Sequence, residues 1–230
     1  MNGILLIDKP KGWTSFDVVN KVRRMCQQSA LSTSNKKRFP VGHTGTLDPM
    51  ATGLLVLLLG TYTKQAPGLT KLDKTYDVTM KLGQTSTTGD VEGEIIDVST
   101  TQPSLEAVTA ALQQFVGDSM QVPPAFSAIK INGQRAYKLA RDGKTPELKA
   151  RPVHIEQITL DSYKYPFVQF TAAVSSGTYI RSLVEDLGKT LGTGAYMSDL
   201  RRTKVGKFEL SEALTMDDLT DQKIAAALQP

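Results

Sequence analysis

One short segment combines residue types that can do chemistry with residue types that tighten a loop. It reads Gly42-His43-Thr44-Gly45-Thr46-Leu47-Asp48-Pro49-Met50-Ala51-Thr52-Gly53 and directly precedes the apolar run at 54–59. Three glycines and an Asp-Pro pair are typical of a tightly folded loop. Such a loop would deliver a carboxylate, Asp48, and an imidazole, His43, to the edge of a sheet. On composition alone, a turn-forming aspartate and a structural histidine remain open as alternatives.

The segments around this loop predict strands interspersed with helices. The run at 54–59 reads as a buried strand, and Tyr76, Val78, Met80 and Leu82 alternate as in a strand. Segregated helices of this kind favour an α+β fold with a largely antiparallel sheet. The expected strands are 3–7, 53–59, 75–82, 94–98, 153–160 and 167–174, and the expected helices begin near Ser15 and cover 104–116 and 178–191.

The first helix has a recognisable start and an apolar face. Ser15 is the expected N-cap, and Ser104 is the expected cap of the helix at 104–116. The polar stretch 27–37 reads as an exposed loop, and its basic cluster Lys36-Lys37-Arg38 is a candidate for phosphate contacts. The expected buried face of the first helix consists of Val18, Val19, Val22, Met25 and Cys26.

Length and composition exclude several classes of protein. With 230 residues and 40% hydrophobic content, the chain could form one large domain or two small ones, and Pro123-Pro124 opens a basic segment that runs to Pro152. The longest apolar run is far shorter than the roughly 20 residues of a membrane-spanning helix, and no secretory signal is recognisable. One cysteine, Cys26, and two histidines, His43 and His154, cannot form a structural zinc set. We therefore expect a cytoplasmic protein; carboxylate-bound magnesium stays open on composition.

The charge is small overall but unevenly distributed. Lys and Arg number 27 against 23 Asp and Glu, which gives a net charge of +4. Residues 1–50 carry eight basic and three acidic groups, residues 130–151 carry seven and two, and residues 81–120 carry one and six. Two basic zones are what a polyanion-binding surface would need, although a solvated surface has the same composition.

Familiar motifs of other enzyme classes are missing from the sequence. It contains no P-loop, no G-x-S-x-G elbow and no H-E-x-x-H pair, and Gly192-Thr193-Gly194 lacks the third glycine of a dinucleotide fingerprint. These absences remove the main support for kinase, serine hydrolase and zinc peptidase activities.

Several spaced motifs together resemble one family. They are Lys9-Pro10-Lys11-Gly12-Trp13-Thr14-Ser15, the loop around Asp48, Lys74-Thr75-Tyr76, Thr85-Ser86-Thr87-Thr88-Gly89-Asp90, the segment 123–143 and Gly177-Thr178-Tyr179-Ile180-Arg181-Ser182-Leu183. In this order they closely resemble the TruB family of tRNA pseudouridine synthases, over nearly the whole chain to about Glu212. The resemblance implies the pseudouridine synthase fold and an isomerase that converts the uridine at position 55, in the TΨC loop of tRNA, without a cofactor.

The resemblance also implies roles for individual residues. Asp48 would be the nucleophile, and attack on the sugar, attack on the base and a glycal route are all left open. Arg181 would pair with that aspartate, and Tyr76 would stack on the target base and assist proton removal at C5. Tyr179 and Leu200 would line the uracil pocket.

RNA binding is implied for a further group of residues. Extracting a base from its stack leaves a gap, which the ring of His43 would fill. The resemblance implies a single catalytic domain covering 1–230, with a basic thumb insertion at about 123–152. This thumb would close over the T-arm through Lys130, Tyr137 and Arg141. We expect a monomer with no obligate protein partner and no membrane association.

Two departures from the family pattern are visible. The chain stops at Pro230, before the PUA-type domain that commonly follows, and the stretch 27–37 is longer than usual. Two alternatives remain: a synthase acting on a different RNA, and a non-catalytic RNA-binding or tRNA-folding module of the same fold. The Asp48, Tyr76 and Arg181 set argues against the second.

Overall fold

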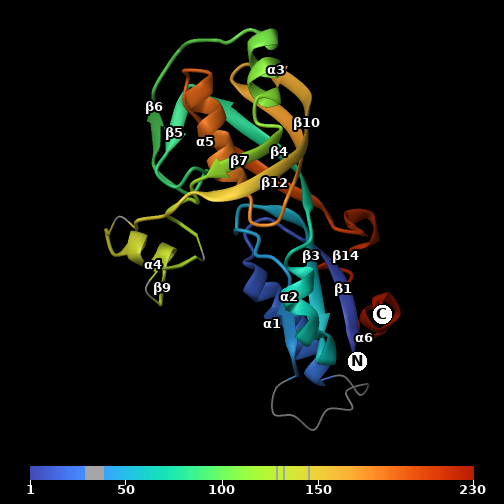
Figure 1. Cartoon of the computed structure of the whole chain (residues 1–230). Coiled ribbons are helices and arrows are strands. Elements are labelled where there is room, and N and C mark those ends of the chain that lie inside the picture. Colours follow the sequence, from blue (N-terminus) through green and yellow to red (C-terminus); the bar gives the residue numbers. More distant parts are fainter. Residues whose placement is uncertain (29–38, 128, 132, 145) are drawn as a thin grey trace. The chain divides into compact units, whose positions relative to one another are not determined.

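The computed structural model describes residues 1–28, 39–127, 129–131, 133–144 and 146–230 (Figure 1). The chain divides into two units, Met1–Tyr76 with Leu200–Pro230 (unit 1) and Asp77–Asp199 (unit 2). Within the described ranges, no helix combines the length and the apolar composition needed to cross a membrane. The basic cluster at 36–38 lies outside the described residues.

Unit 1 is built on a sheet of mixed direction. Its strands are β1 (Gly3–Lys9), β2 (Val41–His43), β3 (Thr52–Leu59), β13 (Phe208–Glu209), β14 (Leu214–Thr215) and the end of β12 (Ala195–Val205). Their order is β14, β1, β3, β12, with β2 paired to β3. Strands β1 and β3 are antiparallel, from Gly3 opposite Leu59 to Lys9 opposite Gly53. The contacts of β1 with β14 and of β3 with β12 are parallel.

Both faces of this sheet are covered, which explains the uninterrupted apolar run in β3. Leu55, Leu57 and Leu59 pack into a cluster with α1 and α6, whereas Leu54, Val56 and Leu58 pack into a second cluster. A strand buried on both faces has no polar side to alternate with. The helical segments of unit 1 are α1 (Ser15–Gln28), η1 (Gly60–Gln65), α2 (Ala66–Leu69), η2 (Leu210–Glu212) and α6 (Asp221–Ala227).

The first helix is confirmed, but its N-cap is not the predicted residue. Thr14 caps α1: its hydroxyl accepts a hydrogen bond from the Asp17 N–H at 3.1 Å, and the Asp17 carboxylate accepts one from the Thr14 N–H at 3.0 Å. Ser15 is buried and makes other contacts, described below. The helix continues to Gln28, so the expected exposed loop does not begin at Gln27.

Unit 2 is a largely antiparallel sheet with helices. Its strand order is β12, β4, β11, β10, β7, and β5 with β6 and β8 with β9 form two separate hairpins. Helix α3 packs against β10 and α5. The elements are β4 (Lys74–Leu82), β5 (Gln84–Ser86), β6 (Ile95–Asp97), α3 (Leu105–Gln113), β7 (Gly117–Gln121), β8 (Lys130–Ile131), β9 (Gln134–Arg135), α4 (Ala136–Arg141), β10 (Arg151–Lys164), β11 (Phe167–Val174) and α5 (Ile180–Thr190).

The predicted elements of unit 2 are confirmed with shifted ends. Ser104 caps α3 by accepting from the Ala107 N–H at 3.2 Å. Strand β10 is longer than expected because it pairs with β7 at its start and with β11 beyond it. Helix α5 is followed by Gly192 and Gly194, both at φ of +67°, a backbone conformation that glycine adopts without strain.

We expect the core of unit 2 to depend strongly on Phe170 of β11. Its side chain is fully buried, so Phe170→Ala leaves a cavity and should cost about 3–5 kcal/mol of unfolding free energy. The matched control is Phe167→Ala on the same strand, where the ring is 44% exposed. Urea unfolding followed by circular dichroism measures both variants. Equal losses in the two would contradict the assigned core.

Candidate active site

The loop that carries Asp48 leaves β2 and enters β3, so both its ends belong to one sheet. The Thr44 N–H donates to the Val56 carbonyl at 3.1 Å, which closes the base of the loop. At its tip, the Ala51 N–H donates to the Asp48 carbonyl at 3.1 Å and forms a tight turn through Pro49. Asp48 itself is half-buried. The loop is therefore an ordered part of unit 1.

The peptide groups on either side of Asp48 are each held by a neighbouring segment. Before it, the Ser15 hydroxyl donates to the Leu47 carbonyl at 3.0 Å and accepts from the Leu47 N–H at 2.8 Å. After it, the Pro49 carbonyl accepts from the Gly12 N–H at 2.8 Å and from Lys9 Nζ at 3.4 Å. Both Ser15 and Lys9 are buried. These contacts restrict the main chain that positions the carboxylate.

His43 ends β2 and has its ring held by the loop. Its Nδ1 accepts a hydrogen bond from the Gly45 N–H at 3.3 Å, so the proton of the neutral ring sits on Nε2. Burial, and next the charge of Arg202, lower the pKa of His43 below its ordinary value. The side chain is therefore a neutral, flat ring with Nε2–H as a donor.

Tyr76 and Leu200 also belong to unit 1. Tyr76 lies on β4 and Leu200 on β12, and both are buried. The Leu200 carbonyl accepts a long hydrogen bond from the Thr52 hydroxyl at 3.5 Å, next to the end of the Asp48 loop. β12 thus brings Leu200 to the same end of β3 as the loop.

Arg181 is a buried cation of unit 2. It lies in the first turn of α5, and its Nη1 is 3.4 Å from Asp90 Oδ2, with both side chains less than a tenth exposed. The guanidinium also donates to the Thr88 carbonyl at 3.1 Å and to the Phe126 carbonyl at 2.8 Å. Asp90 is held in turn by the Thr88 hydroxyl at 2.6 Å. Its predicted pairing with Asp48 stays a prediction.

Tyr179 is held at the start of α5 by a side chain from β7. The Gln121 amide donates to the Tyr179 carbonyl at 3.1 Å and accepts from the Tyr179 N–H at 2.8 Å. Ser182 adds a hydrogen bond to the Val122 carbonyl at 2.8 Å. The backbone that carries Tyr179 and Arg181 is therefore tied to the edge of the unit 2 sheet.

The basic insertion folds as the hairpin β8–β9 followed by α4. Lys130 stands opposite Arg135 in the hairpin and is exposed. The Arg141 and Arg135 guanidinium groups lie 5.7 and 6.0 Å from the centre of the Tyr137 ring. An aromatic ring with two arginines close to it can present both a stacking surface and positive charge. The structure thus brings together Tyr137 and Arg141 of the predicted set.

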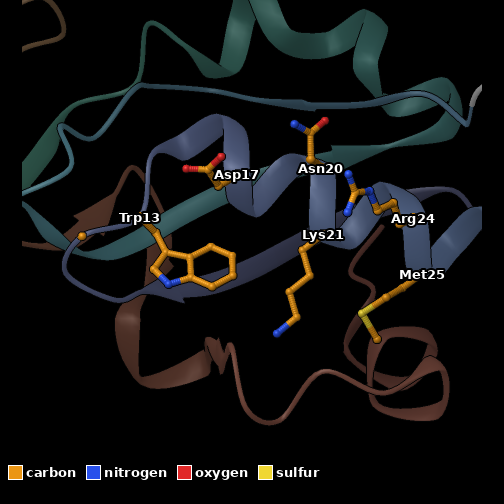
Figure 2. A pocket seen from close by; sticks show the side chains of 7 residues that line it. Trp13, Asp17, Asn20, Lys21, Arg24 and Met25 are labelled. Atoms are coloured by element: carbon orange, nitrogen blue, oxygen red, sulfur yellow. The ribbon is translucent and has the colours of Figure 1, made fainter.

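A separate pocket of about 520 Å³ runs along α1 (Figure 2). Lys21 lies 5.6 Å from the centre of the Trp13 ring and donates to the Met216 carbonyl at 3.0 Å. None of the predicted site residues lines this pocket, whose lining is Gly12, Trp13, Asp17, Asn20, Lys21, Arg24 and Met25. In the part of the chain that the structure describes, no group of three or more His, Cys, Asp or Glu side chains is placed to hold a metal ion.

Three residues of these networks were not identified from the sequence. The sequence indicates only helix capping for Ser15, and the motif that contains Asp90 gives this residue no role of its own. Lys9 opens the first motif, but its complete burial has no sequence signal, because a lysine in a Lys-Pro-Lys stretch ordinarily faces solvent. Their distant partners, Leu47, Pro49 and Arg181, lie 32, 40 and 91 residues away in the sequence.

We expect His43 to titrate below 6.5, its ordinary pKa. The folded state then binds this proton more weakly than the unfolded state, so the stability that His43 contributes is complete above the unfolded pKa and is lost as the pH falls through the folded pKa. An NMR titration of His154→Gln, which leaves His43 as the single histidine, measures the pKa directly.

The dependence of the unfolding free energy on pH would provide a second check on the pKa of His43. His43→Gln should lose less unfolding free energy than wild type between about pH 7 and pH 5. The His154→Gln variant keeps His43, so its unfolding free energy should fall over this pH range as that of wild type does. A His43 midpoint at or above the ordinary value would contradict the neutral ring.

Comparison with known proteins gives two family matches. The model described as "TruB family pseudouridylate synthase (N terminal domain)" matches residues 32–180, and "tRNA pseudouridylate synthase B C-terminal domain" matches 181–229. A tRNA pseudouridine synthase B of Burkholderia mallei is 45% identical over 219 residues, which are 95% of this chain and 69% of the relative. The protein of the same name from Stutzerimonas stutzeri is 43% identical, and the matched region is 68% of its length.

Solved structures show the same fold. A chain in the crystal structure of a Cbf5-Nop10-Gar1 complex superposes with a TM-score of 0.75 at 27% identity, over 99% of this chain. A chain of an H/ACA RNP bound to a substrate RNA superposes with a TM-score of 0.72 at 24% identity. This protein spans 60% and 59% of the length of those two chains. The fold is the α+β pseudouridine synthase fold, and the chain belongs to the TruB family of pseudouridine synthases, which are isomerases.

Proposed function

We propose that this protein converts the uridine at position 55 of the TΨC loop of tRNA to pseudouridine, in the cytoplasm, with Asp48 as the nucleophile. The reaction breaks the bond between N1 and C1′ of the nucleotide, rotates the base and joins C5 to C1′. The proton lost from C5 is balanced by one gained at N1, so the product is an isomer and no outside group or electron is consumed. The coarser activity, tRNA pseudouridine synthase, is supported by 45% identity to proteins of that name.

One observation carries the role of Asp48: the main chain is held on both sides of a carboxylate that itself stays half-buried. Ser15 holds Leu47, and Lys9 and Gly12 hold Pro49. A nucleophile fixed in this way needs little further ordering when the substrate binds. A turn-forming aspartate without a chemical role would not need buried groups on both flanks.

Residues around the target base have roles that fit their surroundings. The Tyr76 ring would stack on the uracil, and its hydroxyl would assist removal of the C5 proton. Tyr179 and Leu200 would line the base pocket. Arg181 would pair with Asp48 and stabilise its ionised form, and its ion pair with Asp90 supports this role by holding the guanidinium in place.

To reach the target uridine, the protein would have to flip its base out of the RNA stack and place another flat group in the gap. A neutral ring suits insertion into a base stack, because it avoids burying a charge among bases. The neutral state of the His43 ring therefore supports the proposal that this ring fills the gap. The thumb carries exposed cations and the Tyr137 ring, which support contact with the T-arm backbone through Lys130, Tyr137 and Arg141.

The catalytic assignment predicts that Asp48→Asn abolishes isomerisation. With an unmodified tRNA transcript, wild type should produce pseudouridine at position 55, and Asp48→Asn should lower the rate by at least about 10⁴-fold. The matched control is Asp217→Asn, which changes an exposed aspartate of unit 1 in the same way and should keep the wild-type rate. Pseudouridine mapping by sequencing and a timed tritium-release assay on C5-labelled tRNA measure both.

The same experiment separates the alternatives. A wild-type protein that binds tRNA but leaves every uridine unchanged would be a non-catalytic binding or folding module. Modification at another position, or of another RNA, would show a synthase with a different target. An Asp48→Asn protein as active as wild type would remove Asp48 from the mechanism.

The thumb assignment predicts a change in salt dependence. Replacing Lys130 and Arg141 with Gln removes two phosphate contacts, so the slope of log affinity against log salt should become shallower by about 1.4 to 1.8. The control pair is Lys164→Gln with Lys189→Gln, two exposed lysines of unit 2 outside the thumb. Filter binding of tRNA across a salt titration gives both slopes. Equal slopes for the two double variants would exclude a specific thumb contact.

A further inference from the structure

One buried side chain of unit 1 reaches both ends of the Asp48 loop. Arg202 lies on β12 and is 2% exposed. Its Nε donates to the Leu54 carbonyl at 2.8 Å, and its Nη2 donates to the Gly45 carbonyl at 3.1 Å. A single planar group therefore joins the start of the loop to the strand that follows it.

Two glycines make this close approach possible. A Cβ on Gly45 would lie 3.3 Å from Arg202 Nη1, and a Cβ on Gly53 would lie 2.3 Å from the Arg202 carbonyl oxygen. Gly53 also has a φ of +98° and pairs with Arg202 across the parallel contact of β3 and β12. A side chain at Gly53 would overlap the Arg202 main chain, and a methyl group at Gly45 would press against the guanidinium, so the loop is packed directly against Arg202.

The hydrogen bonds of the Arg202 guanidinium go to main-chain acceptors. Among the residues that the structure describes, no carboxylate pairs with this guanidinium. A second cation, Lys74, is also buried near Gly45, and its pKa is lowered to about 8 by burial and next by Arg202. Burying unpaired charge is unfavourable. An apolar side chain would avoid this cost but could not join two carbonyls nine residues apart.

We propose that Arg202 is a positioning residue for Asp48, setting the span of the loop between Gly45 and Leu54 so that the carboxylate is held in its reactive orientation. This inference rests on the proposed role of Asp48 as the nucleophile. Arg202 acts through the main chain and does not contact the reacting atoms.

Gly45 links this clamp to His43. The Gly45 carbonyl accepts from Arg202, and the Gly45 N–H donates to His43 Nδ1. Displacing the guanidinium should therefore change the surroundings of the imidazole as well as the loop. Because Arg202 helps to lower the pKa of His43, that pKa reports on whether the clamp is in place.

The test compares Arg202→Met, which keeps the volume and removes the donors, with Arg202→Lys, which keeps a donor and the charge. Single-turnover rates with tRNA at saturating protein separate chemistry from binding. We expect Arg202→Met to lower the rate constant by about 100-fold, as for a misplaced reacting group, with little change in tRNA affinity. Arg202→Lys should recover most of that loss. Lys204→Met, an exposed position on the same strand, is the matched control and should keep the wild-type rate.

Two further measurements keep the test decisive. Gly45→Ala places a methyl group against the guanidinium and should slow the reaction in the same way, so it replaces Arg202→Met if that variant does not fold. In the His154→Gln background, Arg202→Met should raise the pKa of His43, and Lys204→Met should not. Thermal unfolding checks that each variant is folded.

The outcomes distinguish this proposal from the proposed function. A folded Arg202→Met or Gly45→Ala protein with the wild-type single-turnover rate overturns the positioning role. A loss that disappears when protein saturates the tRNA also overturns it, because Arg202 would then act on binding. If Asp48→Asn is active, the nucleophile assignment itself fails, whatever Arg202 does.

Discussion

The hydrogen bonds that hold the peptide groups on either side of Asp48 place demands on the whole of unit 1. They need donors that are buried, and these donors lie 32 to 40 residues before their partners in the loop: Ser15 at the start of α1 and Lys9 at the end of β1. α1 must pack against the sheet to place Ser15 beneath Leu47, and β1 must pair with β3 to place Lys9 beside Pro49. The apolar clusters on both faces of the sheet hold α1 and the β1–β3 pair in these positions. Packing and the positioning of Asp48 therefore depend on the same elements, α1, β1 and β3.

Unit 2 has a different requirement, which is to hold the buried Arg181 guanidinium in one orientation away from bulk solvent. The ion pair between Arg181 and Asp90 is nearly completely buried, and such a pair is stable only when its remaining hydrogen-bonding positions are satisfied. The carbonyls of Thr88 and Phe126 and the Thr88 hydroxyl do this. Gln121 fixes the start of α5 from the neighbouring strand. The orientation of the Arg181 guanidinium therefore depends on main-chain carbonyls as much as on Asp90.

The strands and long helices could be predicted from the sequence because their signals are local. The apolar run of β3, the alternation in β4 and the cap at Ser104 each depend on residues close together in the chain. The candidate loop was also recognisable from its glycines, and the resemblance to a family supplied the role of Asp48. These features need no knowledge of distant partners.

Long-range polar contacts could not be predicted in the same way. Thr14 and Ser15 are both acceptable caps, and only the position of Leu47, 32 residues from Ser15, decides which one turns toward the loop. Arg201 and Arg202 are adjacent and identical in type, yet Arg201 pairs with Asp8 at the surface while Arg202 is buried. Nothing in their local sequence distinguishes them.

The burial of β3 on both faces has a consequence for motion. Its amide groups are hydrogen-bonded in the middle of the unit 1 sheet and shielded by two apolar clusters, so they belong to the part of the unit that opens only when the whole unit unfolds. The Asp48 loop leads directly into that strand. Local fluctuations usually begin in loops, but we expect them to be small in the Asp48 loop because the loop is anchored to this strand. On heating, the loop should persist until unit 1 melts cooperatively.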